Sequence, residues 1–79
     1  MKNPGSSGLQ SAKRALGARI RELRQAKGWS QTAFASMCGI DPSYVSKIEH
    51  GEMNLRCSVL QIIANTLEIS VFSLLVPIA

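Results

Sequence analysis

The feature that most limits what this chain can fold into is the stretch 30–51, SQTAFASMCGIDPSYVSKIEHG. It opens with the start signals of a helix. Ser30 is a favoured N-cap, and Trp29 and Phe34 stand at the spacing of a hydrophobic staple. Apolar residues then recur at helical spacing until Gly39, whose backbone freedom permits a sharp turn. The pattern predicts a short helix that begins directly after Ser30 and ends at a tight turn.

A second set of start signals follows at once. Asp41 can cap a helix, and Pro42 suits the first helical position, where its missing N–H costs nothing. Gly51 stands where a left-handed terminator is expected. The sequence therefore predicts a second helix from Pro42 to His50. Two short helices joined by such a turn form a helix-turn-helix.

The predicted second helix has one apolar and one polar side. Val45 and Ile48 share the apolar side, and the polar side carries Ser43, Ser46, Lys47 and His50. Any surface helix turns polar residues outward, so periodicity alone does not show a function. The paired helices favour the other interpretation, that this polar face enters a groove.

Residues across the unit resemble the phage-repressor helix-turn-helix family of Cro and cI type. The resemblance rests on Ser30-Gln31, Phe34-Ala35, Gly39-Ile40, Ser43-Tyr44-Val45-Ser46, Ile48-Glu49 and Gly51, and it extends from about Leu16 to Leu75. It implies an all-α, compact five-helix bundle of the lambda-repressor-like DNA-binding type, with the helix-turn-helix at helices two and three. In size the chain also resembles the small controller regulators of restriction–modification systems and the small phage Cro proteins, and the sequence does not decide between these two.

The resemblance and the helix geometry together imply contacts to double-stranded DNA. The positions expected at base edges are Pro42, Ser43, Ser46 and Lys47. The positions expected at phosphates are Gln31, Tyr44, His50, Asn54 and Arg56. Gln31 stands at a helix N-terminus, where N–H groups attract anions, although it also suits a plain surface position. Arg56 precedes a predicted helix, where a cation opposes the helix dipole and so favours a role toward a partner.

One structural pair is also implied. Arg24 lies at the edge of the apolar stripe of the first helix, so its stem would pack while its guanidinium needs an acceptor. In the resembling family an Arg at this position pairs with a Glu at the end of the recognition helix, which here is Glu49. The alternative is that both side chains are solvated.

Charge and composition agree with a polyanionic partner. The chain has nine Lys and Arg against five Asp and Glu, a net charge of +4 and a pI of about 9.6. Six of the nine cations lie between residues 13 and 27, with Glu22 as the one acid among them. The sequence shows no arrangement of nucleophile, base and orienting group and no phosphate-binding glycine loop, so we expect no enzyme and no cofactor.

The remaining class predictions concern cysteines and location. Cys38 and Cys57 stand far apart, so neither a metal site nor a disulfide framework is predicted, and both are expected as small core residues. No apolar run reaches the ~18 residues of a membrane span, and residues 1–10 lack the apolar h-region that is typical of a signal peptide. We expect a cytoplasmic protein.

The 79 residues divide into two predicted parts. Residues 1–10, rich in Gly, Ser and Pro, are expected to be disordered, and residues 11–79 form the domain, with a first helix from near Ser11 to Gly28. Later helices are expected at 57–67 and 71–75. The predicted core comprises Leu16, Ile20, Leu23, Phe34, Val45, Ile48, Leu60, Ile63 and Leu67.

The last eleven residues remain crowded with apolar side chains. They either close the core or mark an interface. We expect a homodimer through Ile69, Phe72 and Leu75, because two-fold symmetry is the commonest assembly and matches a pseudo-palindromic operator. The leading hypothesis is a sequence-specific transcriptional regulator. The alternative is an antitoxin-like or other protein-interaction module, whose protein partner the sequence does not identify.

Overall fold

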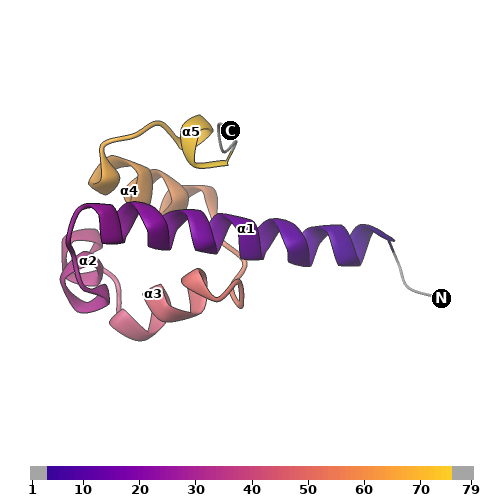
Figure 1. Ribbon diagram of the computed structural model, residues 1–79, viewed down its shortest axis with the longest axis horizontal. Coiled ribbons are helices and arrows are strands. Elements are labelled where there is room, and N and C mark those ends of the chain that lie inside the picture. Colours follow the sequence, from indigo (N-terminus) through magenta and orange to yellow (C-terminus); the bar gives the residue numbers. More distant parts are fainter. Residues whose placement is uncertain (1–3, 76–79) are drawn as a thin grey trace.

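The computed structural model describes residues 4–75, with side chains from residue 10 onward. In this part of the chain all regular structure is helical, which confirms the all-α, five-helix prediction. The helices are α1 (Pro4–Ala26), α2 (Gln31–Cys38), α3 (Pro42–Glu49), α4 (Cys57–Leu67) and α5 (Val71–Leu75). The long helix α1 runs through the middle, with α2 and α3 on one side and α4 and α5 on the other (Figure 1). Residues 76–79 of the predicted domain lie outside the described part.

Helix α1 is longer than predicted. Disorder was predicted for residues 1–10 and a helix start near Ser11, whereas the structure begins α1 at Pro4. Proline is tolerated at the first helical position, and extending a packed helix costs far less than nucleating a new one. The structure therefore corrects the predicted helix start near Ser11. Residues 1–3 lie outside the described part, and the domain boundary at residue 11 stays a prediction.

The helix-turn-helix unit has most of the predicted caps. The Ser30 side chain accepts the N–H of Ala33 at 3.0 Å, and the rings of Trp29 and Phe34 stack with centroids 6.1 Å apart. Gly39 ends α2 in the left-handed conformation, with φ of 71°. Asp41 precedes α3 with the expected extended backbone, but its side chain makes no capping hydrogen bond, which corrects that prediction.

The core lies where the two helix layers meet α1. Its buried apolar residues include seven of the predicted nine, and the other two, Leu16 and Leu23, pack against it half-buried. Leu74, one of the crowded C-terminal apolar residues, is also buried, at 1% exposure, and so helps to close the core. Burial raises the pKa of the Cys38 thiol, against the opposing effect of its hydrogen bond to Thr66. The full buried set is Ile20, Phe34, Ala35, Cys38, Val45, Ile48, Leu60, Ile63, Ala64, Leu67 and Leu74.

The exposure of Cys57 and the hydropathy of the helices complete the description of the fold. Cys57 is exposed at the first turn of α4, so the prediction that both cysteines lie in the core is wrong for this one. In the part of the chain that the structure describes, no helix combines the length and hydropathy needed to cross a membrane.

Candidate nucleic-acid interface

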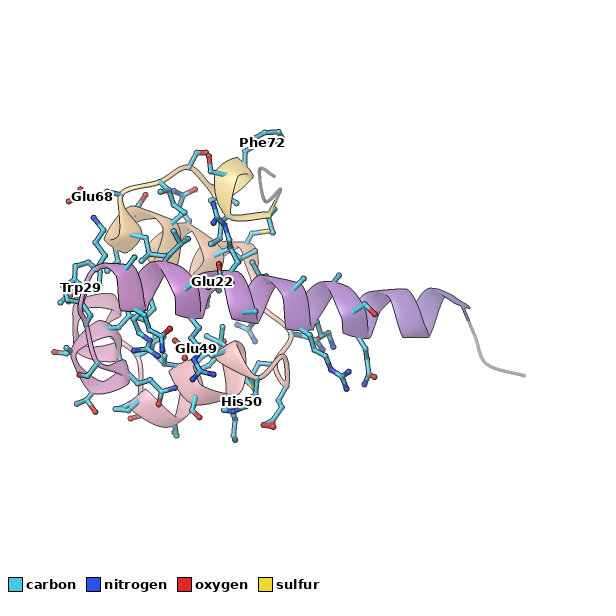
Figure 2. All side chains as sticks on the ribbon, viewed as in Figure 1. Glu22, Trp29, Glu49, His50, Glu68 and Phe72 are labelled. Carbon is cyan, nitrogen blue, oxygen red and sulfur yellow. The ribbon has the colours of Figure 1, made fainter. Side chains whose placement is uncertain are left out.

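The inner side of α3 is held by a buried ion pair. Arg24 of α1 donates from Nε to Glu49 Oε2 at 2.6 Å and from Nη2 to Glu49 Oε1 at 3.1 Å. The same guanidinium donates from Nη1 to the carbonyl of Trp29 at 2.8 Å. Both residues are buried, at 7% and 8% exposure, and Figure 2 shows Glu49 between α1 and α3. The pair expected between these two residues is therefore present.

A third side chain completes this network. Gln31, the first residue of α2, donates from Nε2 to Glu49 Oε1 at 3.0 Å. The Glu49 carboxylate thus accepts three hydrogen bonds from two other helices. A fork of two parallel bonds fixes orientation as well as distance, so the C-terminal end of α3 is locked to α1 and α2.

The close approach of α1 to α3 depends on a residue that the sequence analysis passed over. Gly17 is buried, and a Cβ built on it would stand 2.3 Å from the Ile48 carbonyl oxygen and 2.8 Å from that of Glu49. No side chain fits there. A glycine inside a helical pattern is the signal that could have indicated such a backbone contact.

The outer side of α3 is polar and open. Pro42, Ser43 and Lys47 are exposed, and Ser46 is half-buried. Ser43 and Lys47 stand four residues apart and therefore share one face of the helix. Since Val45, Ile48 and Glu49 are buried on the opposite side, the core presents this face outward. The structure thus brings the predicted base-contacting residues together on one side of α3.

The predicted phosphate-contacting residues around α2 and α3 differ in how far their side chains are exposed and free of other contacts. The Gln31 amide points to Glu49, so its backbone N–H at the start of α2 is the more direct donor to a phosphate. Tyr44 is half-buried and packs against the core. His50, which the sequence placed within the helix, caps its C-terminus instead, and its Nδ1 lies 2.7 Å from the Ser46 carbonyl oxygen. A carbonyl oxygen only accepts, so Nδ1 carries the proton and Nε2 faces outward (Figure 2).

The loop after α3 adds exposed polar groups. Asn54 and Arg56 are exposed, and the Arg56 side chain makes no capping bond to α4. Arg14 of α1 is exposed and lies against Gly51: a Cβ on this glycine would stand 2.9 Å from Arg14 Cγ. Gly51 has φ of 72°, as its predicted role as a terminator requires. An exposed cation therefore lies beside the end of α3, and no local sequence signal indicates this proximity.

The residues predicted for the homodimer interface lie on the other side of α1 from α3, at α5 and just before it. Phe72 is 71% exposed and projects from α5, and Leu75 is 50% exposed (Figure 2). Ile69 is half-buried against the core, so it contributes only part of its side chain to this surface. Ile62 of α4 is also exposed, at 40%. Within the described residues, no group of three or more His, Cys, Asp or Glu side chains could hold a metal ion.

Comparison with known proteins agrees with this geometry. The sequence profile of the helix-turn-helix family HTH_3 matches residues 20–74. A hypothetical transcription factor of Neisseria meningitidis is 35% identical over 68 residues, which are 86% of this chain and 64% of that protein. This chain thus spans a little under two thirds of that relative's length.

Two solved structures have the same fold. The restriction–modification controller protein C.AhdI of Aeromonas hydrophila is 38% identical, with a TM-score of 0.78 over 81% of this chain and 97% of the controller. The biofilm master regulator SinR, solved in complex with DNA, is 34% identical, with a TM-score of 0.73 over 77% of this chain and 98% of SinR. These relatives are regulators and not enzymes, as the sequence predicted for this chain. The chain belongs to the HTH_3 helix-turn-helix family, of the Cro and cI type.

Proposed function

We propose that the chain is a sequence-specific DNA-binding transcriptional regulator that acts as a homodimer on a pseudo-palindromic operator. The observation that carries this proposal is the two-sided construction of α3. Its inner side is locked by the core and by the Arg24–Glu49 pair, while its outer side exposes Ser43 and Lys47. A rigid helix with a small polar outer face fits the major groove of DNA.

In this proposal the base edges are read by Pro42, Ser43, Ser46 and Lys47. Lys47 is the strongest candidate, because an exposed ammonium can donate to guanine O6 or N7. Ser43 accepts or donates at either type of base pair, and Pro42 adds apolar contact area at the start of the helix. The short side chains of Ser43 and Ser46, one turn and one residue before Lys47, would allow α3 to approach the groove floor.

Phosphate contacts would flank the bases. The proposed set comprises Gln31, Tyr44, His50, Asn54 and Arg56. We add Arg14, because it is exposed and lies beside the end of α3. Gln31 would act through its backbone N–H, since its side chain is engaged with Glu49. These residues lie before, within and after α3, as expected of contacts that position a recognition helix in its groove.

The homodimer would form through α5 and the end of α4. Phe72 and Leu75 supply the exposed apolar area, and the accessible part of Ile69 extends it. These residues belong to the layer opposite α3, so two recognition helices can face the same side of a duplex. Half-sites about 34 Å apart, one helical turn, would then match the two-fold symmetry.

Selection of bound sequences from random duplex DNA tests the function. We expect two copies of one short motif in inverted orientation, with centres about one helical turn, ~10 base pairs, apart. A Lys47→Ala variant, carried through the same selection, should lose preference at one or two positions of each motif. Absence of any enriched motif at about 150 mM salt would refute sequence-specific binding.

The dimer needs a separate test. Phe72→Glu or Leu75→Glu should give a folded monomer in sedimentation, with much weaker operator binding, because a charge in an apolar interface is costly. Gln61→Glu, at an exposed polar position on α4, is the matched control and should leave the assembly unchanged. An unmodified protein that stays monomeric at tens of micromolar, both free and on DNA, would contradict the dimer.

The exposed α5 surface also favours a second candidate function, an antitoxin-like module that holds another protein chain. Salt dependence separates the two functions. DNA binding through several phosphates should weaken by orders of magnitude between about 50 and 200 mM salt, whereas an apolar protein contact should not. A strong complex with a protein and no salt-sensitive DNA binding would favour the module.

A further inference from the structure

A cavity of about 300 Å³ lies between α1, the end of α3, the loop that follows it, α4 and α5. Most of its lining is apolar, with aliphatic side chains from every one of these elements. The polar members are Lys13, Arg19 and Asn54, and none of the described lining residues is acidic. The apolar members that matter most here are Leu16, Ile48, Met53, Leu55, Leu60 and Leu74.

Arg19 is the unusual group in this lining. It is half-buried, and its Nε is shielded from water yet has no hydrogen-bond partner among the described residues. A buried N–H of a charged group without an acceptor is costly, and native structures rarely keep one without a reason. Lys13 lines the same cavity and adds a second positive charge. The cavity thus combines apolar walls with two cationic side chains, and one N–H of Arg19 lacks an acceptor.

We propose that this cavity binds a small carboxylate with an apolar body. The apolar chain or ring would lie against Leu16 and Leu60. A modest rotation of the Arg19 side chain would let Nε and one Nη donate to the two carboxylate oxygens, the planar pairing that a guanidinium favours. A volume of about 300 Å³ is at the lower end of ligand pockets, so the ligand is a medium-chain or single-ring acid and not a long-chain lipid.

The position of the cavity gives such a ligand a route to α3. Ile48 of α3 and Met53, Asn54 and Leu55 of the following loop form part of the wall. The same loop carries Asn54 and Arg56, two proposed phosphate contacts. A ligand that binds one arrangement of this loop more tightly than others would shift the loop toward that arrangement and so change DNA affinity. This second step rests on the proposed DNA-binding function, whereas carboxylate binding does not.

Titration of the isotope-labelled full chain followed by NMR tests the site. Octanoate and 3-phenylpropanoate serve as chain and ring probes, with octanol and acetate as probes for the body and the head alone. We expect saturable shifts at Leu16, Ile48 and Leu60 with octanoate, with 3-phenylpropanoate or with both, and which acid binds more tightly identifies the ligand class. Equal binding of octanol and octanoate, or no saturable shift with either acid, would overturn the proposal.

Two variants and a control test whether Arg19 binds the carboxylate of the ligand. Arg19→Gln should weaken carboxylate binding about tenfold or more, because it removes a charge-assisted hydrogen bond, and should leave octanol binding unchanged. Arg21→Gln removes an exposed cation from the same helix, away from the cavity, and should have little effect. Ala15→Leu extends a side chain from the cavity lining and should abolish binding of both octanoate and octanol. Circular dichroism should show that this variant keeps its fold. Equal loss in Arg19→Gln and Arg21→Gln would overturn the assignment of Arg19.

Two other occupants are outcomes of the same titration. If a second copy of the chain fills the cavity through the side that Leu75 lines, the apparent affinity for octanoate falls as protein concentration rises. If residues 76–79 fill it, octanoate binds only after they are removed. Either result overturns the proposal.

The link to DNA is measured last, with operator DNA from the selection experiment. A shift in operator affinity with octanoate that disappears in Ala15→Leu supports the regulatory step. Octanoate binding without any effect on operator affinity overturns that step and leaves the binding site standing. Absence of an operator refutes the proposed function and not the carboxylate site.

Discussion

Replacing Arg24 with Met is the sharpest test of how α3 is held in place. The Met side chain keeps most of the apolar stem volume and removes the three hydrogen bonds that the guanidinium donates. Glu49 is then left buried with only Gln31 as a partner. Breaking a buried ion pair by removing one member typically costs ~3–5 kcal/mol, because an uncompensated charge remains.

That loss is large for a domain of this size, whose free energy of unfolding is of the order of 5–10 kcal/mol. A small domain loses roughly 4–8 °C of melting temperature per kcal/mol, so Arg24→Met should melt at least roughly 12 °C lower. Glu49→Met should cost a similar amount, since it strands the Arg24 charge. The double variant should lie within ~2 kcal/mol of the parent, because both charges are gone and only the Trp29 carbonyl and the Gln31 amide lose a partner.

Urea denaturation at low temperature measures all three variants on one scale, and the double-mutant cycle gives the coupling free energy directly. The control is Glu68→Gln, which weakens the exposed pair of Lys27 and Glu68, 3.7 Å apart, and should change stability by less than ~1 kcal/mol. Additive single losses, or an Arg24→Met cost no larger than that of the control, would show that the buried pair does not hold α3.

Three further predictions concern the packing of α1 on α3 and the proposed contacts to DNA. Gly17→Ala should lower the free energy of unfolding by about 1–3 kcal/mol in urea titration, despite the helix propensity it adds, because the new methyl group meets the Ile48 carbonyl oxygen; Ser11→Ala, exposed on the same helix, should be neutral or stabilising. Lys47→Ala should cost ~1–3 kcal/mol on the preferred operator and much less on unrelated DNA, and equal weakening on both would make it a phosphate contact. Arg56→Ala should reduce the slope of log affinity against log salt by about one, and an unchanged slope would remove it from the interface.

Local chemistry made much of this fold predictable from the sequence. Ser30 caps α2 through a bond to an N–H three residues later, and Gly39 and Gly51 take the left-handed conformations that their positions require. These signals act over a few residues, so one sequence contains all the information they need. The outward face of α3 follows in the same way, because Val45 and Ile48 fix which side is buried.

What the sequence did not predict depends on contacts between distant segments. Gly17 was passed over as one residue of a predicted helix, and only the packing of α1 on the end of α3 explains why a glycine stands there. Gln31 looked like a surface residue at a helix start, yet the position of Glu49 turns its amide inward. The extent of α1 before Ser11 was missed for a related reason: Gly and Ser favour disorder locally, and a packed helix overrides that preference by propagation.

Helix α3 uses different residues for packing and for the proposed DNA contacts, so the two can vary separately. The residues that fix the helix are Val45, Ile48 and Glu49, and the proposed base contacts are the exposed Ser43 and Lys47 on the other side. Neither Ser43 nor Lys47 takes part in the hydrogen bonds to Glu49. Substitutions at these two exposed positions therefore leave those hydrogen bonds intact. Surface substitutions of this kind usually change stability by less than ~0.5 kcal/mol, whereas a base contact is worth ~1–3 kcal/mol of discrimination. If the proposed function holds, operator preference on this scaffold can change with little effect on folding. The close backbone contact at Gly17, which fixes the position of α3 relative to α1, sets the limit.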